Sequence, residues 1–358
     1  MGNPLLKKTV VAGGPLWVAV GEGGELIAKS TDGNVWTPAA IVDGVSGKGG
    51  IMYSGQGVAY GKDNLGAGLW VAVGGGGLIA KSTDGNVWTP AATKGGITNT
   101  ARGVAYGKDA SGAGLWVAVG GGGIIAKSTN GNNWTPADTV DGVSGKGGIT
   151  ENASGVAYGK DASGTGLWVA VGSGGFIAKS TDGTTWTSAA SKGGIESYGR
   201  GVAYGKDASG AGLWVAVGGG EVIVKSTDGN TWTPAYNKGG ITNVGTGVAY
   251  GKDASGVGLW VAVGGGGLIA KSTDGNVWTP AASTGGITVY GQGVAYGKDN
   301  LGGNLWVAVG YTGIIAKSTD GNVWTSTATV TGVSGKGGIT DVGYGVAFKR
   351  ILYDGVDF

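Results

Sequence analysis

Short apolar segments and glycine-rich segments alternate along the chain in a repeat, whose unit is represented by Gly68–Ala92, GLWVAVGGGGLIAKSTDGNVWTPAA. The same letters return at Gly258–Ala282, and edited copies begin near Leu16, Leu115, Leu167, Leu213 and Leu305. The leading tryptophans of the copies are 46 residues apart, with two longer intervals of 53 and 52. Seven copies at this period predict one repeat array over residues 1–358. The units are marked by the pairs Trp17/Trp36, Trp70/Trp88, Trp116/Trp134, Trp168/Trp186, Trp214/Trp232, Trp260/Trp278 and Trp306/Trp324.

Each unit contains four short apolar runs that end at glycines or at an Asp-Gly turn. In the third unit they are residues 103–106, 115–119, 124–127 and 133–135. Runs of this length, rich in β-branched and aromatic residues, predict strands and are too short for helices. The second run is apolar throughout, which fits a strand covered on both faces. We therefore predict an all-β fold, a seven-bladed β-propeller with four antiparallel strands per blade.

The two chain ends indicate how such a ring closes. The chain starts on the second strand of its first unit and ends just after an extra first strand, residues 345–348. We expect this C-terminal strand to complete the first blade, because an open ring would expose a strand edge. The alternative is that Val10–Ala12 takes that place and the last eight residues form an added strand or tail.

Composition and charge exclude several classes of protein. Glycine makes up 84 of 358 residues without a three-residue period, which excludes collagen, and 41% hydrophobic residues argue against disorder. The absence of cysteine and histidine excludes thiol nucleophiles, Ser-His-Asp triads and the usual zinc ligands. A net charge of +2, with lysines spread over the repeats, predicts no nucleic-acid partner. We also expect no secretory signal peptide and no membrane span, and the sequence assigns no compartment.

The turn between the third and fourth strands reads Ser-Thr-Asp-Gly-Asn-Val-Trp at residues 82–88. The Asp can accept backbone hydrogen bonds, the Gly can adopt positive φ, and the Trp can cover the core. The pattern resembles the Asp-box, or bacterial neuraminidase repeat, although Asp and Gly are adjacent here. The resemblance implies propeller blades with this turn between their third and fourth strands, and it implies no particular reaction. We interpret these turn residues as structural: Asp32, Asp84, Asn130, Asp182, Asp228, Asp274 and Asp320.

The sequence does not contain a set of residues typical of a sialidase or another glycosidase active site. A sialidase would need three arginines around one substrate carboxylate, but Arg350 follows the opposite end of a first strand from Arg102 and Arg200. Other glycosidases need two carboxylates about 5–9.5 Å apart, and none of the five glutamates pairs with an unrepeated aspartate. We expect a non-enzymatic member of the Asp-box propellers, with no catalytic residue, metal or cofactor.

Comparison of the seven units shows which loops depart from the repeat. In a propeller, the loops after the first and third strands share one face, and here they are nearly invariant. The loops after the second and fourth strands share the other face and carry most substitutions. We interpret these substitutions as serving recognition, and the alternative is neutral drift on exposed loops. Tyr, Gln and Arg on loops of a rigid ring suit contact with sugars or proteins. The candidate ligand-binding residues are Tyr53, Gln56, Arg102, Tyr198, Arg200, Tyr290, Gln292, Tyr311 and Tyr344.

These observations favour a non-catalytic recognition module. Our first hypothesis is multivalent carbohydrate binding through the variable loop face, since several equivalent sites would turn weak binding into avidity. The alternative is a structural or assembly scaffold that binds one protein partner asymmetrically. A glycosidase is the third hypothesis. The expected partner is thus a glycan or a protein surface.

Overall fold

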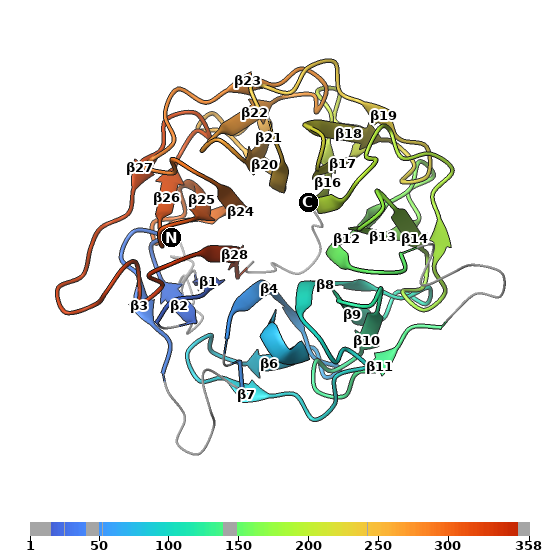
Figure 1. The fold of residues 1–358 in the computed structure, drawn as a ribbon, viewed down its shortest axis with the longest axis horizontal. Coiled ribbons are helices and arrows are strands. Elements are labelled where there is room, and N and C mark those ends of the chain that lie inside the picture. Colours follow the sequence, from blue (N-terminus) through green and yellow to red (C-terminus); the bar gives the residue numbers. More distant parts are fainter. Residues whose placement is uncertain are drawn as a thin grey trace, which may run out of the picture.

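The structure is a computed structural model that describes residues 16–24, 26–40, 50–51, 53–138, 149–241 and 243–349. Within these residues the chain forms seven four-stranded antiparallel sheets, arranged as blades around a central axis (Figure 1). The predicted seven-bladed β-propeller is confirmed. A short 3-10 helix, η1 (Gly75–Gly77), interrupts the described strands once.

Each blade uses four strand positions, numbered from the axis outwards, and blade 1 contains β28, β1, β2 and β3. The first strands of blades 1 to 7 are β28 (Gly343–Phe348), β4 (Gly55–Lys62), β8 (Ala101–Lys108), β12 (Ala153–Lys160), β16 (Gly199–Lys206), β20 (Gly245–Lys252) and β24 (Gly291–Lys298). The second strands are β1 (Trp17–Gly21), β5 (Gly68–Gly74), β9 (Gly114–Gly120), β13 (Gly166–Gly172), β17 (Gly212–Gly218), β21 (Gly258–Gly264) and β25 (Asn304–Gly310). The third strands are β2 (Ile27–Ser30), β6 (Leu78–Ser82), β10 (Ile125–Ser128), β14 (Ile177–Ser180), β18 (Val222–Ser226), β22 (Ile269–Ser272) and β26 (Ile315–Ser318). The fourth strands are β3 (Thr37–Pro38), β7 (Thr89–Pro90), β11 (Thr135–Pro136), β15 (Thr187–Ser188), β19 (Thr233–Pro234), β23 (Thr279–Pro280) and β27 (Thr325–Ser326).

The predicted strand ends in the third unit are wrong by one or two residues. The first strand β8 is longer than predicted, because a register shift between Ala101 and Gly103 lets its pairing with β9 continue towards the loop. The fourth strand β11 starts later than predicted. Trp134 belongs to the preceding turn, where its indole N–H donates to the Gly131 carbonyl at 3.0 Å. Only Thr135 and Pro136 pair with the third strand.

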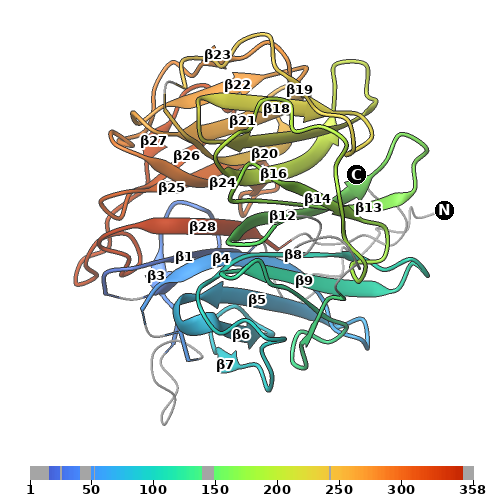
Figure 2. The same cartoon turned by 45° about the vertical axis from the view of Figure 1, so that its right-hand side comes forward.

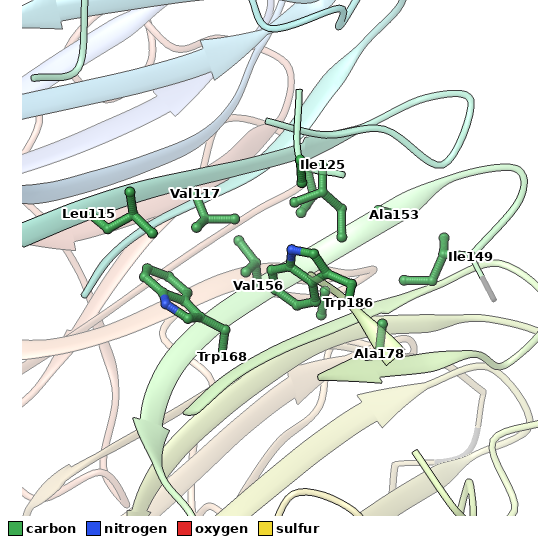
Figure 3. Close-up of a cluster of buried hydrophobic side chains, with 12 residues drawn as sticks. Leu115, Val117, Ile125, Ile149, Ala153, Val156, Trp168, Ala178 and Trp186 are labelled. Carbon is green, nitrogen blue, oxygen red and sulfur yellow. The ribbon is translucent and has the colours of Figure 1, made fainter. Parts of the chain in front are cut away.

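The core consists of seven apolar clusters, each formed where two neighbouring blades pack together. Between blades 3 and 4, Leu115 and Val117 of β9 contact Trp168 and Trp186 of the next blade (Figure 3). The alternate β9 residues, including Trp116, face blade 2 instead. Both faces of the second strand are therefore buried, as its unbroken apolar sequence predicts.

The first strands pack tightly around the axis. Tyr250 of β20 lies beside Trp260 on the neighbouring strand, with ring centroids 5.0 Å apart. Its ring also lies over Gly205 of the preceding blade, where an added Cβ would be 2.2 Å from the tyrosine Cγ. Glycine at this position therefore allows the aromatic ring of one blade to cover the backbone of the blade before it.

Blade 1 joins the two ends of the described chain. Strand β28 pairs antiparallel with β1, with Trp17 opposite Phe348 and Ala19 opposite Val346. This pairing confirms that the C-terminal strand completes the first blade. Val10–Ala12, the alternative for this place, lies outside the described residues, as does Arg350.

The loops divide between the two faces as predicted. An isolated bridge links Ser173, in the loop after a second strand, to Tyr198, which directly precedes the next first strand. On the other face, the Trp116 indole N–H donates to the Lys62 carbonyl at the end of the neighbouring first strand, at 2.9 Å. Figure 2 shows loops at both ends of the strands. We call the face with the loops after second and fourth strands the variable face, and the other the invariant face.

The described residues include no helix that is long and apolar enough to cross a bilayer.

Removal of the closing strand tests how the ring is held. We expect deletion of residues 343–358 to lower the Tm by on the order of 10 °C, because it exposes the edge of β1 and one face of two blade interfaces. Deletion of residues 351–358, which retains β28, is the control and is expected to change the Tm little. Calorimetry measures both variants. Equal melting temperatures would contradict closure by β28.

Candidate binding site at one mouth of the central channel

A narrow channel runs along the axis of the ring. Each first strand contributes one Gly-Val pair to its wall, beginning with Gly57 and Val58. Neighbouring strands are so close that a Cβ at Gly103 would lie 2.9 Å from the Ser154 carbonyl oxygen. The channel volume of about 160 Å³ is well below the several hundred Å³ usual for ligand pockets. The channel is therefore too small to enclose a ligand of ordinary size, and a candidate site on the axis lies at one of its mouths.

The residue before each channel glycine varies among the blades and forms a ring at the mouth on the variable face. In blades 1 to 7 this ring contains Tyr344, Gln56, Arg102, Ser154, Arg200, Thr246 and Gln292. Five of these residues are candidates from the sequence. Ser154 and Thr246 are not among the candidates, because small hydroxyl residues are not distinctive by type. Their position in the repeat, directly before a channel glycine, would have identified them.

Two arginines of this ring lie on blades 3 and 5, on either side of Ser154. Arg102 is half-buried, and its Nε is buried without a hydrogen-bond partner. Burial lowers the pKa of Arg102, as does the nearby charge of Arg200, while Tyr344 acts in the opposite direction. The two arginines are therefore close enough to repel each other. We call Arg102, Ser154 and Arg200 the cationic arc.

Arg200 also contacts Tyr198, another candidate ligand-binding residue from the sequence. Its guanidinium lies over the ring of Tyr198, 4.9 Å from the ring centroid. Contacts of this kind are worth about 0.5–1 kcal/mol at exposed sites. The tyrosine thus supports the exposed arginine at the edge of the mouth.

The opposite part of the ring is aromatic and hydrogen-bonded. Burial raises the pKa of the Tyr344 phenol to about 12, reinforced by the charge and the hydrogen bond of Glu22, and opposed by a hydrogen bond from Gln56. Gln56 also donates to the Ser54 hydroxyl at 2.9 Å. Tyr344 is therefore neutral at physiological pH and is held in place by two neighbours.

Tyr290 and Tyr311 extend this aromatic side outwards. Their ring centroids are 5.3 Å apart, and the Asn243 amide reaches the Tyr290 hydroxyl at 3.4 Å. Tyr311 is 39% exposed, so the pair presents an aromatic surface to solvent. We call Tyr290, Tyr311 and Tyr344 the aromatic arc.

Not every predicted residue joins these arcs. Gln292 lies in the mouth ring between Thr246 and Tyr344. Tyr53 is 70% exposed and has no ring contact with another candidate among the described residues. The structure thus brings eight of the nine predicted residues to the mouth or its edge and leaves Tyr53 apart.

The Asp-Gly turns lie on the invariant face and are internally satisfied. In blade 2, Asp84 Oδ1 accepts hydrogen bonds from the backbone N–H groups of Asn86 and Val87, at 2.8 and 2.9 Å. The Ser82 hydroxyl donates to the same oxygen at 2.9 Å. Burial alone would raise the pKa of the Asp84 carboxyl, but these hydrogen bonds outweigh it and hold the pKa below its ordinary value of 3.8.

The same turns also connect neighbouring blades. Asn86 accepts hydrogen bonds from the Ala40 N–H of blade 1, through its carbonyl at 3.0 Å and its side-chain oxygen at 3.1 Å. Gly85 adopts a φ of 72°, and a Cβ there would lie 2.6 Å from the Leu16 side chain. This geometry agrees with a structural role for the turn residues. Among the described residues, no three Asp or Glu side chains are grouped so that they could hold a metal ion.

No family model matches the chain, and no curated protein matches its sequence. Among solved structures, YCF48 from Cyanidioschyzon merolae has a TM-score of 0.52 at 17% identity, with 77% of this chain and 86% of that chain covered. A structure described as YCF48 bound to D1 peptide has a TM-score of 0.50 at 18% identity, covering 72% and 77%. Virginiamycin B lyase from Staphylococcus aureus, in its selenomethionine form, has a TM-score of 0.56 at 12% identity, covering 77% and 84%. At these identities the likeness shows the propeller fold alone.

The Asp turns allow a pH-dependent test. We expect Asp84→Ala to lower the free energy of unfolding by about 1–2 kcal/mol at neutral pH, since three hydrogen bonds lose their acceptor. Asp84→Asn keeps the acceptor and is expected to cost less, as Asn130 makes the same backbone contacts in blade 3. Because the pKa of Asp84 is lowered on folding, its charge stabilises the fold above pH 3.8 and that contribution is lost as the pH falls through the folded pKa. The deficit of Asp84→Asn should therefore shrink in acid.

Urea unfolding monitored by tryptophan fluorescence, at pH 7 and near pH 3, measures these differences. The reverse substitution Asn130→Asp is the matched control and should stabilise blade 3 slightly at neutral pH. A deficit of Asp84→Asn that grows in acid would contradict the assignment.

The position of Arg102 gives a second test. We expect Arg102→Gln to leave the free energy of unfolding unchanged or to raise it by about 1 kcal/mol, because it removes an unpaired buried donor and a like-charge repulsion. Glutamine already occupies this ring position in blades 2 and 7. Lys108→Gln at the other end of β8 is the charge-matched control. Urea unfolding measures both, and a clear loss of stability in Arg102→Gln alone would show that the arginine is structural.

Proposed function

We propose that the protein is a non-catalytic scaffold that binds one protein partner across its variable face. The observation that carries this proposal is the asymmetry of the channel mouth. A cationic arc on blades 3 to 5 faces an aromatic arc contributed from blades 7 and 1. Such an arrangement is complementary to one asymmetric partner, because charged and aromatic groups at fixed places define its orientation.

The comparisons are compatible with this proposal. One similar structure is described as bound to a peptide, and another is a lyase, so the shared fold accommodates both binding and catalysis. The proposal therefore depends on this chain's own residues. The similarity of the Asp-Gly turns to Asp-box repeats supports a structural use of the invariant face and leaves the variable face for recognition.

Carbohydrate binding is the second candidate. The observation in its favour is the half-exposed tyrosine pair, Tyr290 and Tyr311, since aromatic faces suit the apolar faces of sugar rings. Multivalent binding at seven equivalent sites would require the same side chains in each blade, but the mouth ring contains five residue types. A sugar would therefore bind at one preferred place.

One experiment separates the two candidates. The purified chain is screened in parallel against a displayed library of random 12-residue peptides and against a glycan array, and hits are titrated by calorimetry. We expect selected peptides to bind with one site per chain. The double variant Tyr290→Ala/Tyr311→Ala should weaken this binding at least tenfold, because exposed aromatic residues provide the anchoring contacts.

The matched control is Leu65→Ala/Leu301→Ala, which removes two exposed apolar side chains from loops on the invariant face. We expect this variant to bind the selected peptides as the unaltered chain does. Glycan hits without peptide hits would overturn the protein scaffold in favour of the lectin, and an effect of the leucine variant alone would place binding on the wrong face.

A further inference from the structure

The three residues of the cationic arc lie on consecutive first strands, β8, β12 and β16. The strands approach so closely that a Cβ at Gly155 would lie 2.6 Å from the Arg200 carbonyl oxygen. Adjacent backbones therefore hold the three side chains side by side at the mouth. Ser154, the smallest side chain of the ring, lies on the strand between those of the two arginines, whose side chains are the longest.

The charges of the arc are not neutralised within the described residues. The ion pair found there joins Lys238 and Glu221, at 3.5 Å, and involves neither arginine. Glu22, a carboxylate on the variable face, is hydrogen-bonded to Tyr344. The charge acting most on Arg102 is that of Arg200, which is repulsive. Two like charges are thus held near each other with a buried Nε donor unsatisfied.

We infer that the cationic arc binds one carboxylate of the protein partner, supplied by an Asp or Glu side chain or by a free chain terminus. A planar carboxylate can accept paired hydrogen bonds from guanidinium groups, and the Ser154 hydroxyl adds a further donor. The bound anion would remove the repulsion between Arg102 and Arg200. This inference rests on the proposed function for the source of the carboxylate, and the arc itself can be tested without it.

The composition of the chain makes a direct measurement possible. It contains three arginines, Arg102, Arg200 and Arg350, so ¹⁵N-arginine labelling gives three Nε–Hε signals. The substitutions Arg102→Gln and Arg200→Gln assign them. The labelled chain is titrated at low salt with acetate, with an acetylated and amidated glycine-serine peptide containing one glutamate, and with the glutamine version of that peptide ending in a free carboxylate.

We expect the Arg102 and Arg200 signals to shift together and saturate with at least one of the two peptides, and with acetate at higher concentration. Arg200→Gln should weaken binding about tenfold, the effect of one charge-assisted hydrogen bond. Lys206→Gln, at the other end of the same strand β16, removes an equal charge from the invariant face and should bind normally. The peptide that binds identifies the source of the carboxylate.

The outcomes separate this inference from the proposed function. Unsaturated shifts that chloride reproduces, or equal weakening by Lys206→Gln, would overturn the carboxylate site and leave the scaffold to be judged by the peptide screen. N-acetylneuraminic acid is titrated as well. If it saturates the arc while neither peptide does, the carboxylate site stands and the protein partner is overturned.

Discussion

The ring depends on the packing of two tryptophans of each blade against the apolar second strand of the blade before it. Trp168 and Trp186 are fully buried against Leu115 and Val117 at the interface of blades 3 and 4, and the other interfaces repeat this contact. Truncating a buried aromatic residue of this kind typically costs about 3–5 kcal/mol, whereas whole domains are stable by about 5–15 kcal/mol. The stability of each blade therefore depends on its packing against both neighbours.

This dependence explains why the chain ends meet within one blade. Each blade presents an apolar face on both sides, so an open array would leave two such faces exposed to water. Pairing of β28 with β1 makes blade 1 from both ends of the chain and supplies the last interface, where Trp17 and Trp36 pack on Leu305 and Val307. The next interface, between blades 1 and 2, differs in one contact. Among the described residues, the Trp70 indole N–H has no hydrogen-bond partner, whereas the Trp116 indole N–H donates to the Lys62 carbonyl.

The repeat made the fold predictable, because the same strand pattern can be identified in seven units and compared among them. Strand ends were less predictable, since they depend on contacts between segments, such as the bulge at Ala101 and the inward position of Trp134. For the site, residue type and repeat position identified Arg102, Arg200 and Tyr344 as candidates. The sequence could not show that Glu22 reaches Tyr344, because the two meet only when β28 closes the ring. It also could not show that the ring of Tyr290 lies beside that of Tyr311, because the two residues come from different loops.

The structure also explains why variation is concentrated on one face. On the invariant face, backbone and side chains are occupied by contacts that hold blades together: the Asp84 turn is internally hydrogen-bonded, and Asn86 binds the preceding blade. A substitution in these turns would weaken an interface. At the variable mouth, each ring residue lies at a register shift and has no partner in the strand pairing, as Arg200 and Gln292 show, so glutamine, arginine, serine, threonine and tyrosine are all tolerated at one position. Recognition can therefore change at this mouth without loss of stability, which is the physical condition for a repeat scaffold to acquire a specific partner.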